Sequence, residues 1–272
     1  FEGTLIHPQH WPEGLDYSGK KMFVIGSGAT TVTIIPAVAE AVEHVTMLQR
    51  SPSYVFSSPN SSPIGELLDG LDLDEQLVHE IIRRRNLKDG EQIAWMAREQ
   101  PETLRKELMD GVRALLPQDY DVETHFNPSY MPWEERLCLV PDGDLFKAIS
   151  SGKASVVTDN IKSFTKNGIL LESGDELEAD IVVSATGLTL CPMGNIPFAV
   201  DGDSVDFSKA WTYKGIMYSD LPNMAWTFGY IRTSWTMRSD LIADFVCRLL
   251  KQLDEKGASS VTPRLRTEDH NM

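Results

Sequence analysis

The sequence has few cysteines: there are 3 in 272 residues, Cys138, Cys191 and Cys247. They are far apart and odd in number, so they offer neither a C-x-x-C motif nor a disulfide framework. This excludes a disulfide-stabilised secreted domain and a dithiol redox centre. We therefore expect a reducing, cytoplasmic location.

Positive charge is also scarce, since Lys and Arg total 25 against 40 Asp and Glu, for a net charge of −15. This balance argues against nucleic acid or an anionic membrane as a general partner. No apolar run is long enough to span a membrane, and no signal-peptide pattern is present. The chain begins with Phe rather than Met, which leaves processing or truncation open.

The first part of the chain alternates strand and helix patterns. Residues 20–26, KKMFVIG, form a short apolar run ending in glycine, which predicts a buried strand. Residues 27–42 have apolar positions at helical spacing, although Pro36 should kink or interrupt that helix. Residues 44–50, HVTMLQR, predict a second strand. Strand, glycine turn, helix and strand open a doubly wound α/β sheet of the Rossmann type.

The pattern then changes to helices with mixed charge. We expect a helical insertion over about residues 57–130, followed by a return of the α/β pattern with a buried strand and glycine turn at 181–187. Near the end, residues 221–231 predict a strand and loop, and 234–257 an amphipathic helix stopped by Gly257. We expect residues 258–272 to be a frayed tail.

The glycine turn GSGATT partly matches the G-x-G-x-x-G pattern, because Gly26 and Gly28 are present but Thr31 holds the third position. The strand before it and the helix after it strengthen the match, since a helix N-terminus and close backbone approach suit a pyrophosphate. A plain strand-to-helix turn is the alternative. The predicted nucleotide-binding residues here are Gly26, Ser27, Gly28, Ala29, Thr30 and Thr31.

The end of the second strand indicates which dinucleotide binds. NAD sites usually place Asp or Glu there for the ribose 2′-hydroxyl, whereas this chain has Arg50 and Ser51. A guanidinium beside a hydroxyl suits a 2′-phosphate. The sequence therefore predicts NADPH rather than NADH, with a solvated loop arginine as the alternative.

The opening stretch FEGTLIHPQHWP resembles the F-x-G-x-x-x-H-x-x-x-W-[PD] fingerprint of Baeyer–Villiger monooxygenases, within the flavin-containing monooxygenase group. The segments HVTMLQRSPSYV, MPWEERLCLVPDGDLFKAI, ADIVVSATGL and FGYIRTSWT are similar to the ethionamide-activating subgroup. The fingerprint positions are Phe1, Gly3, His7, Trp11 and Pro12. The resemblance implies that they link two dinucleotide domains. His7 and His10 are not expected to bind metal, because Pro8 breaks a helix and no cysteine is near.

The resemblance implies an enzyme that uses FAD, NADPH and O2, and that inserts one oxygen atom into a ketone through a C4a-peroxyflavin. The alternatives are an N- or S-oxygenating monooxygenase acting for example on a thioether, or, from another class, a non-catalytic NADP(H)-binding module. The sequence does not name the substrate or the oligomeric state.

Further site residues come from the resemblance. It implies that Arg136 is the fixed cation that stabilises the oxygenating peroxide. Many relatives have Lys just before this arginine, whereas this chain has Glu135, which would repel a phosphate if it faced one. The resemblance also implies a domain crossing at Thr186 and Gly187, and a helix N-terminus facing the flavin. The residues expected at that N-terminus are Ser234, Trp235 and Thr236.

The resulting domain organisation is a linker at residues 1–12, an NADPH-binding domain at 13–187, and the returning part of an FAD-binding domain at 188–272. Only one glycine-rich fingerprint is present, whereas the resemblance requires a second for FAD. We therefore expect a fragment whose FAD fingerprint lies in a preceding segment of the same protein.

Overall fold

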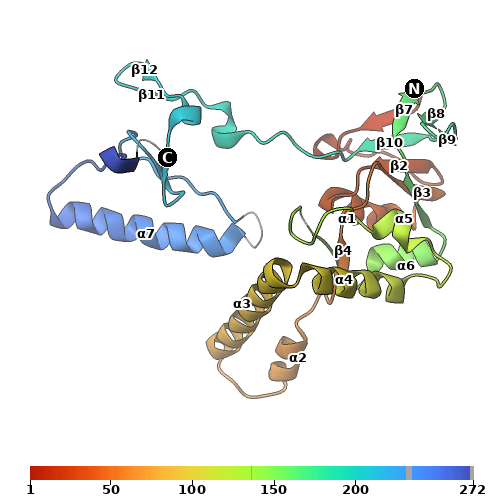
Figure 1. Cartoon of the computed structure of the whole chain (residues 1–272), viewed down its shortest axis with the longest axis horizontal. Coiled ribbons are helices and arrows are strands. Elements are labelled where there is room, and N and C mark those ends of the chain that lie inside the picture. The colour runs from red at the N-terminus through yellow and green to blue at the C-terminus, as the bar shows by residue number, and fades with distance from the viewer. Residues whose placement is uncertain (136, 231–234, 270–272) are drawn as a thin grey trace. The chain divides into compact units, whose positions relative to one another are not determined.

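The computed structural model describes residues 1–135, 137–230 and 235–269 (Figure 1). The chain divides into two compact units, Phe1–Leu188 and Thr189–Met272. This division lies beside the predicted boundary at 187/188; the nucleotide assigned to each side stays a prediction.

The first unit is built on a five-stranded sheet in which every neighbouring pair is parallel. The carboxyl ends of all the strands therefore lie at one edge and the amino ends at the other. This confirms the predicted Rossmann-like α/β fold. Across the sheet the strands are β1 (Thr4–Ile6), β10 (Ile181–Ser184), β2 (Lys21–Ile25), β3 (His44–Gln49) and β6 (Ala154–Thr158).

The two faces of the sheet have different covers because successive side chains of a strand point to opposite faces. Met22 and Val24 of β2 belong to a large core with the helices, whereas Phe23 between them packs with Ile169 and Leu171. The helices of the first face are α1 (Ala29–Val38), α5 (Val122–Phe126) and α6 (Asp144–Ser150). The second face is covered by an antiparallel sheet of β7 (Ile161–Phe164), β8 (Gly168–Leu171) and β9 (Glu176–Glu178).

The helical insertion lies between two strands that pair with each other, β4 (Val55–Ser58) and β5 (Cys138–Pro141). Besides α5 it contains α2 (Pro63–Asp69), α3 (Glu75–Glu99) and α4 (Pro101–Leu115). Helix α4 buries Leu104, Met109 and Val112, whereas α3 has no buried residue. Helix α2 packs on α3, and α3 packs on α4 (Figure 1).

The second unit has a small core of Ile216, Met217 and Ile242. Ile242 belongs to the long helix α7 (Trp235–Glu255), and Gly257 follows it with a φ of 59°. The remaining elements are β11 (Ala199–Val200), β12 (Asp203–Ser204), β13 (Thr212–Tyr213), β14 (Met217–Tyr218) and the 3-10 turns η2 (Pro192–Asn195), η3 (Phe207–Lys209) and η4 (Thr267–Asp269).

Two local expectations were wrong. Residues 221–230 form no strand among the residues described, and Trp226 N donates one isolated hydrogen bond to Ile216 O at 2.9 Å. The expected frayed tail is ordered over residues 258–269, because Asn223 N donates to Val261 O at 2.9 Å and Val261 packs on the small core. Helix α1 includes Pro36 and ends two residues later at Val38, before the predicted limit at residue 42, and the Val38 side chain is buried in the large core.

Candidate functional site at the carboxyl edge of the sheet

The carboxyl edge of the parallel sheet gathers most of the predicted nucleotide residues. Gly26 follows β2, Arg50 follows β3, and Ala185 and Thr186 follow β10. Because β10 and β3 are the two neighbours of β2, these three strand ends lie next to one another. Open parallel sheets bind ligands at this edge. The fold therefore brings together residues that are separated by up to 160 positions in the sequence.

Gly26 occupies a position that only glycine fits. Its φ is 130°, and a Cβ atom built there would lie 2.4 Å from the carbonyl oxygen of Ala185. Its amide donates to Leu48 O at 2.8 Å, and Ala185 N donates to Ile25 O at 2.9 Å. The turn is thus held against both neighbouring strands, and Gly26 permits the close approach.

Gly28 differs from Gly26, because open space surrounds its Cα atom, whereas Gly26 lies against the backbone of Ala185. Gly28 is the N-cap of α1, so no side chain caps this helix. A Cβ atom built on Gly28 would lie more than 4 Å from any neighbouring side chain or strand in the described part of the chain. Thr31, in the first turn of α1, is fully buried, and its Oγ1 has no hydrogen-bond partner among the residues described. The free amides of such a helix N-terminus favour an anion.

Two residues that the sequence analysis did not assign to the site form hydrogen bonds with Ser27 of the glycine turn. Ser53 Oγ lies 2.8 Å from Ser27 Oγ, and the Cys138 thiol donates to Ser27 O at 3.7 Å. Cys138 is buried at the start of β5 and is 111 positions from Ser27. No sequence pattern links these positions, so only the tertiary fold identifies them.

Arg50 and Ser51 are exposed directly after β3, whereas the preceding Gln49 is 1% exposed. Gln49 Nε2 donates to His125 O at 2.8 Å and to Thr158 Oγ1 at 2.9 Å. Burial lowers the pKa of His125, and Asp121 opposes this in part, so the neutral imidazole is favoured. The sequence analysis singled out neither His125 nor Thr158.

Thr186 and Gly187 lie where the chain leaves the sheet after β10. Thr186 is exposed, and Gly187 has a φ of 105°, in the region that favours glycine. The first unit ends one residue later at Leu188. The glycine therefore turns the chain at the exit from the parallel sheet, at the same edge as the glycine turn.

The fingerprint at residues 1–12 is part of the first unit. Thr4–Ile6 form the edge strand β1, and a Cβ at Gly3 would lie 2.5 Å from Asp180 O. His7 follows β1 at the carboxyl edge, and its Nδ1 accepts from Gln9 N at 3.3 Å, capping the 3-10 turn η1 (Pro8–His10). Phe1 pairs with the ring of Phe164, Trp11 contacts Tyr17 edge-on, and Pro12 is exposed. These contacts give the fingerprint a place in the sheet, while its linker role stays a prediction.

Arg136 lies outside the described residues, but the turn leading to it is defined. Trp133 has a φ of 69°, which is rare for a bulky residue. Around it, Glu134 N donates to Met131 O at 3.0 Å, and Met131 N donates to a Glu134 carboxylate oxygen at 2.8 Å. Glu135 is exposed. Local hydrogen bonds therefore hold residues 131–134 in this turn.

Of the residues expected near the flavin, Ser234 lies outside the described residues, and Trp235 and Thr236 form the first turn of α7. The Trp235 ring lies 4.8 Å from that of Phe228, and a Cβ at Gly229 would clash with the indole. One turn later, Arg238 Nη2 donates to Lys214 O at 2.7 Å. The start of α7 is thus tied to the turn before β14.

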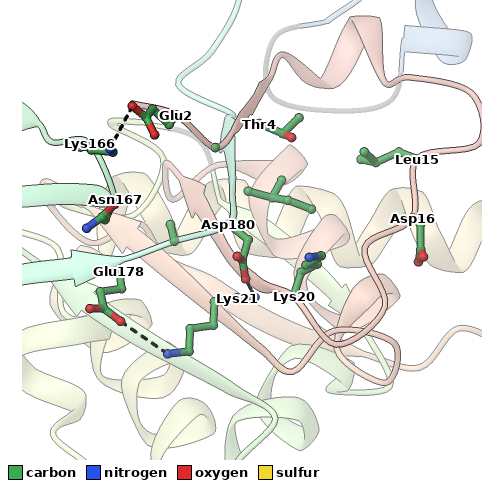
Figure 2. Close-up of a pocket in the computed structure, with 13 residues that line it drawn as sticks. Glu2, Thr4, Leu15, Asp16, Lys20, Lys21, Lys166, Asn167, Glu178 and Asp180 are labelled. Carbon is green, nitrogen blue, oxygen red and sulfur yellow. Dashed lines mark hydrogen bonds and ion pairs between the residues drawn. The ribbon is translucent and has the colours of Figure 1, made fainter.

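A pocket of about 560 Å³ lies at the opposite, amino edge of the sheet (Figure 2). Four of its charged side chains form ion pairs: Lys166 lies 3.3 Å from Glu2, and Lys21 lies 3.8 Å from Glu178. Of the predicted site residues, only Gly3 lines it. We place the candidate site at the carboxyl edge instead, because ligands of open parallel sheets bind there.

Comparison of the sequence with known proteins gives close relatives over almost the whole chain. It is 49% identical over 265 residues to the FAD-containing monooxygenase EthA of Mycolicibacterium smegmatis. It is 49% identical over 264 residues to the probable FAD-binding monooxygenase AlmA of Acinetobacter baylyi. The chain is a homologue of FAD-containing monooxygenases. This confirms the resemblance recognised from its motifs.

The alignments to EthA and AlmA cover 97% of this chain but 54% and 53% of the relatives. The chain therefore spans about half the length of these monooxygenases. A putative FAD-containing monooxygenase, MymA of Mycobacterium tuberculosis, is 48% identical over 268 residues, with 54% of its length covered. No family model matches the chain.

Solved structures of monooxygenases share the fold. OTEMO in an FAD-bound form matches with a TM-score of 0.76 at 19% identity, over 100% of this chain and 60% of that one. An oxidized steroid monooxygenase bound to NADP matches with a TM-score of 0.75 at 19% identity, over 99% of this chain and 60% of that one. At this identity the likeness concerns the fold alone.

Within the described part of the chain, no helix is both long and apolar enough to cross a membrane.

Proposed function

We propose that this chain forms the NADPH-binding region and part of the FAD-binding region of a flavin-dependent monooxygenase. The observation that carries the proposal is the glycine turn at the carboxyl edge of the sheet, with Gly26 locked against Ala185 and open space at Gly28. The homology to FAD-containing monooxygenases supports the same conclusion. The domain limits we propose are residues 13–187 for NADPH and 188–272 for the FAD part.

The residues at this edge fit a dinucleotide. Space at Gly28 lets the backbone approach a pyrophosphate, and the N-terminus of α1 offers amides and a positive dipole. Arg50 and Ser51, exposed at the end of β3, would hold the 2′-phosphate of NADPH. Glu135 is exposed as well, so the preference for NADPH depends on Arg50 rather than on a second cation at that position.

The flavin would be held in part by the start of α7, with Ser234, Trp235 and Thr236, and Thr186 and Gly187 would bind cofactor where the chain leaves the parallel sheet. The positive end of a 21-residue helix stabilises negative charge on a reduced ring. The pyrophosphate of FAD would bind to the part of the protein that corresponds to the remaining length of the relatives.

Bound FAD, reduced by NADPH, would supply the oxygen chemistry by transferring one atom of O2 to the substrate. The role of the protein is to bind and orient both cofactors and to exclude water. Arg136 is the proposed fixed cation near the reacting oxygen, because a guanidinium keeps its proton. We propose a ketone as substrate, with S- or N-oxygenation of a thioether or amine as the second outcome of the assay.

The proposal is tested by calorimetric titration of the purified chain with NADPH and NADH. We expect Arg50→Ala to weaken NADPH binding about 10- to 100-fold, as for the loss of a charge-assisted contact to phosphate, and to leave NADH binding unchanged. Arg83→Ala, on the exposed surface of α3, is the matched control. Equal affinities for the two nucleotides in the unmodified chain would contradict the proposed NADPH site.

The oxygenation step needs a separate assay with the flavin-loaded full-length protein, because the proposed FAD site extends beyond this chain. We expect NADPH oxidation to be coupled to conversion of a simple ketone, and Arg136→Ala to abolish product while NADPH still binds. Conversion of a thioether but not of the ketone would favour the S-oxygenating alternative. NADPH binding without any flavin uptake by the full-length protein would favour a non-catalytic NADP(H)-binding module.

A further inference from the structure

Three polar side chains, of which one is buried and two are partly buried, form a cluster at the carboxyl end of β3, on the side of the sheet covered by α5. We call Gln49, His125 and Thr158 the Gln49 cluster. Gln49 is 1% exposed, and its two hydrogen-bond partners, His125 and Thr158, lie 76 and 109 positions after it in the sequence. Burying an amide without hydrogen bonds is costly, so a buried glutamine in this position requires an explanation.

The hydrogen bonds fix the orientation of the Gln49 amide. Nε2 donates to the carbonyl oxygen of His125, which can only accept, so the nitrogen and oxygen cannot exchange places. The same Nε2 donates to Thr158 Oγ1, and Thr158 Oγ1 lies 2.9 Å from His125 Nδ1. Gln49 Oε1 is buried, with no partner among the residues described.

The cluster restrains Gln49, the residue directly before Arg50. Gln49 is the last residue of β3, and Thr158, the last residue of β6, is its partner in the parallel register. The backbone is held as well, because Asp159 N donates to Gln49 O at 2.9 Å. Side-chain and backbone contacts therefore fix the point where the chain leaves the sheet, one residue before the guanidinium.

We propose that the Gln49 cluster is a positioning device for Arg50 and thereby determines the selectivity for a 2′-phosphate. The inference rests on the proposed NADPH site and identifies the residues that hold its arginine in position. A long arginine side chain loses conformational freedom when it binds a phosphate, and a fixed base reduces that loss. A nucleotide without the 2′-phosphate makes no such contact, so its affinity does not depend on the cluster.

The same two strands carry a second polar network that serves as a control. Near their amino ends, His44 Nε2 lies 2.8 Å from Ser155 Oγ, which lies 3.1 Å from Thr46 Oγ1. This network also joins β3 to β6 through a hydroxyl and an imidazole. It lies at the far end of the strands from Arg50, so its loss perturbs the same pair of strands without touching the proposed site.

The experiment measures the affinity of the purified chain for 2′,5′-ADP and for 5′-AMP, which differ by the 2′-phosphate. We expect Gln49→Met and Thr158→Val each to weaken 2′,5′-ADP about fivefold and to leave 5′-AMP within about twofold. Ser155→Ala should change neither affinity. In the double variant Arg50→Ala/Gln49→Met, we expect no loss beyond that of Arg50→Ala alone, because the cluster acts through the arginine.

Several results would overturn the inference. Equal weakening of both ligands by Thr158→Val would mean that the cluster only stabilises the fold, and an additive double variant would mean that Gln49 does not act through Arg50. If Gln49→Met does not fold, as judged from its thermal transition, Thr158→Val and its double variant with Arg50→Ala decide. Failure of the proposed function is distinguishable, because Arg50→Ala would then leave 2′,5′-ADP binding unchanged.

Discussion

The carboxyl and amino edges of the parallel sheet use the same five strands for different purposes. At the carboxyl edge, Gly26 brings two backbone segments together, and the buried residues Thr31 and Gln49 keep unpartnered side-chain oxygens among the residues described. At the amino edge, four of the charged side chains that line the pocket are exposed and form two ion pairs with one another. A pocket alone therefore does not identify a functional site. Buried polar groups without hydrogen-bond partners, next to space for a ligand, are a better indication.

The largest effect should come from the tight glycine. We expect Gly26→Ala to lower the free energy of unfolding by roughly 3 kcal/mol or more, because the new methyl group meets Ala185 O and the φ of 130° is unfavourable for alanine. Urea denaturation measures this change.

Gly19→Ala is the matched control in the loop before β2. Gly19 has a φ of 64° but no described atom within 4 Å of a Cβ, so backbone strain alone should cost about 1 kcal/mol. Equal costs for the two variants would show that the contact with Ala185 is unimportant.

Gly28 should separate stability from binding. Its φ of −87° and the open space around it predict that Gly28→Ala changes the free energy of unfolding by less than about 0.5 kcal/mol. Binding of NADPH should weaken about tenfold, because the methyl group occupies the approach to the pyrophosphate. Calorimetric titration beside a denaturation curve tests both, and an unchanged NADPH affinity would remove Gly28 from the site.

The buried imidazole should make stability depend on pH. The pKa of His125 is lowered from 6.5, so between the folded and unfolded pKa values the folded protein binds fewer protons than the unfolded one. The stability therefore falls as the pH drops below about 6.5. We expect a lower Tm near pH 5.5 than near pH 7.5, and a smaller difference in His125→Gln. An unchanged difference would assign the pH dependence to other groups.

The amino edge should give the smallest effect. Lys21 and Glu178 are exposed and their charged atoms lie 3.8 Å apart, a geometry that contributes little in water. We expect Lys21→Met to change stability by less than about 0.5 kcal/mol and to leave the affinity for 2′,5′-ADP unchanged. A loss of nucleotide affinity in this variant would contradict the assignment of function to the opposite edge.

The sequence alone was sufficient for the elements whose signal is local. Apolar runs and helical spacing predicted β2, β3, the helical insertion and α7, and strand–glycine–helix order predicted the turn at Gly26 and Gly28. The motif resemblance was also readable, because its residues are fixed by spacing along the chain. The frayed tail and the strand at 221–231 were mispredicted, since contacts such as that between Asn223 and Val261 decide them.

Only the tertiary structure showed what surrounds these motifs. The approach of Ala185 to Gly26, the thiol of Cys138 below Ser27, and the Gln49 cluster join residues 76 to 159 positions apart. A local sequence pattern indicates which secondary structure a segment prefers. Which buried polar groups find partners depends on the register of parallel strands and the packing of α5, and these are settled by the whole core.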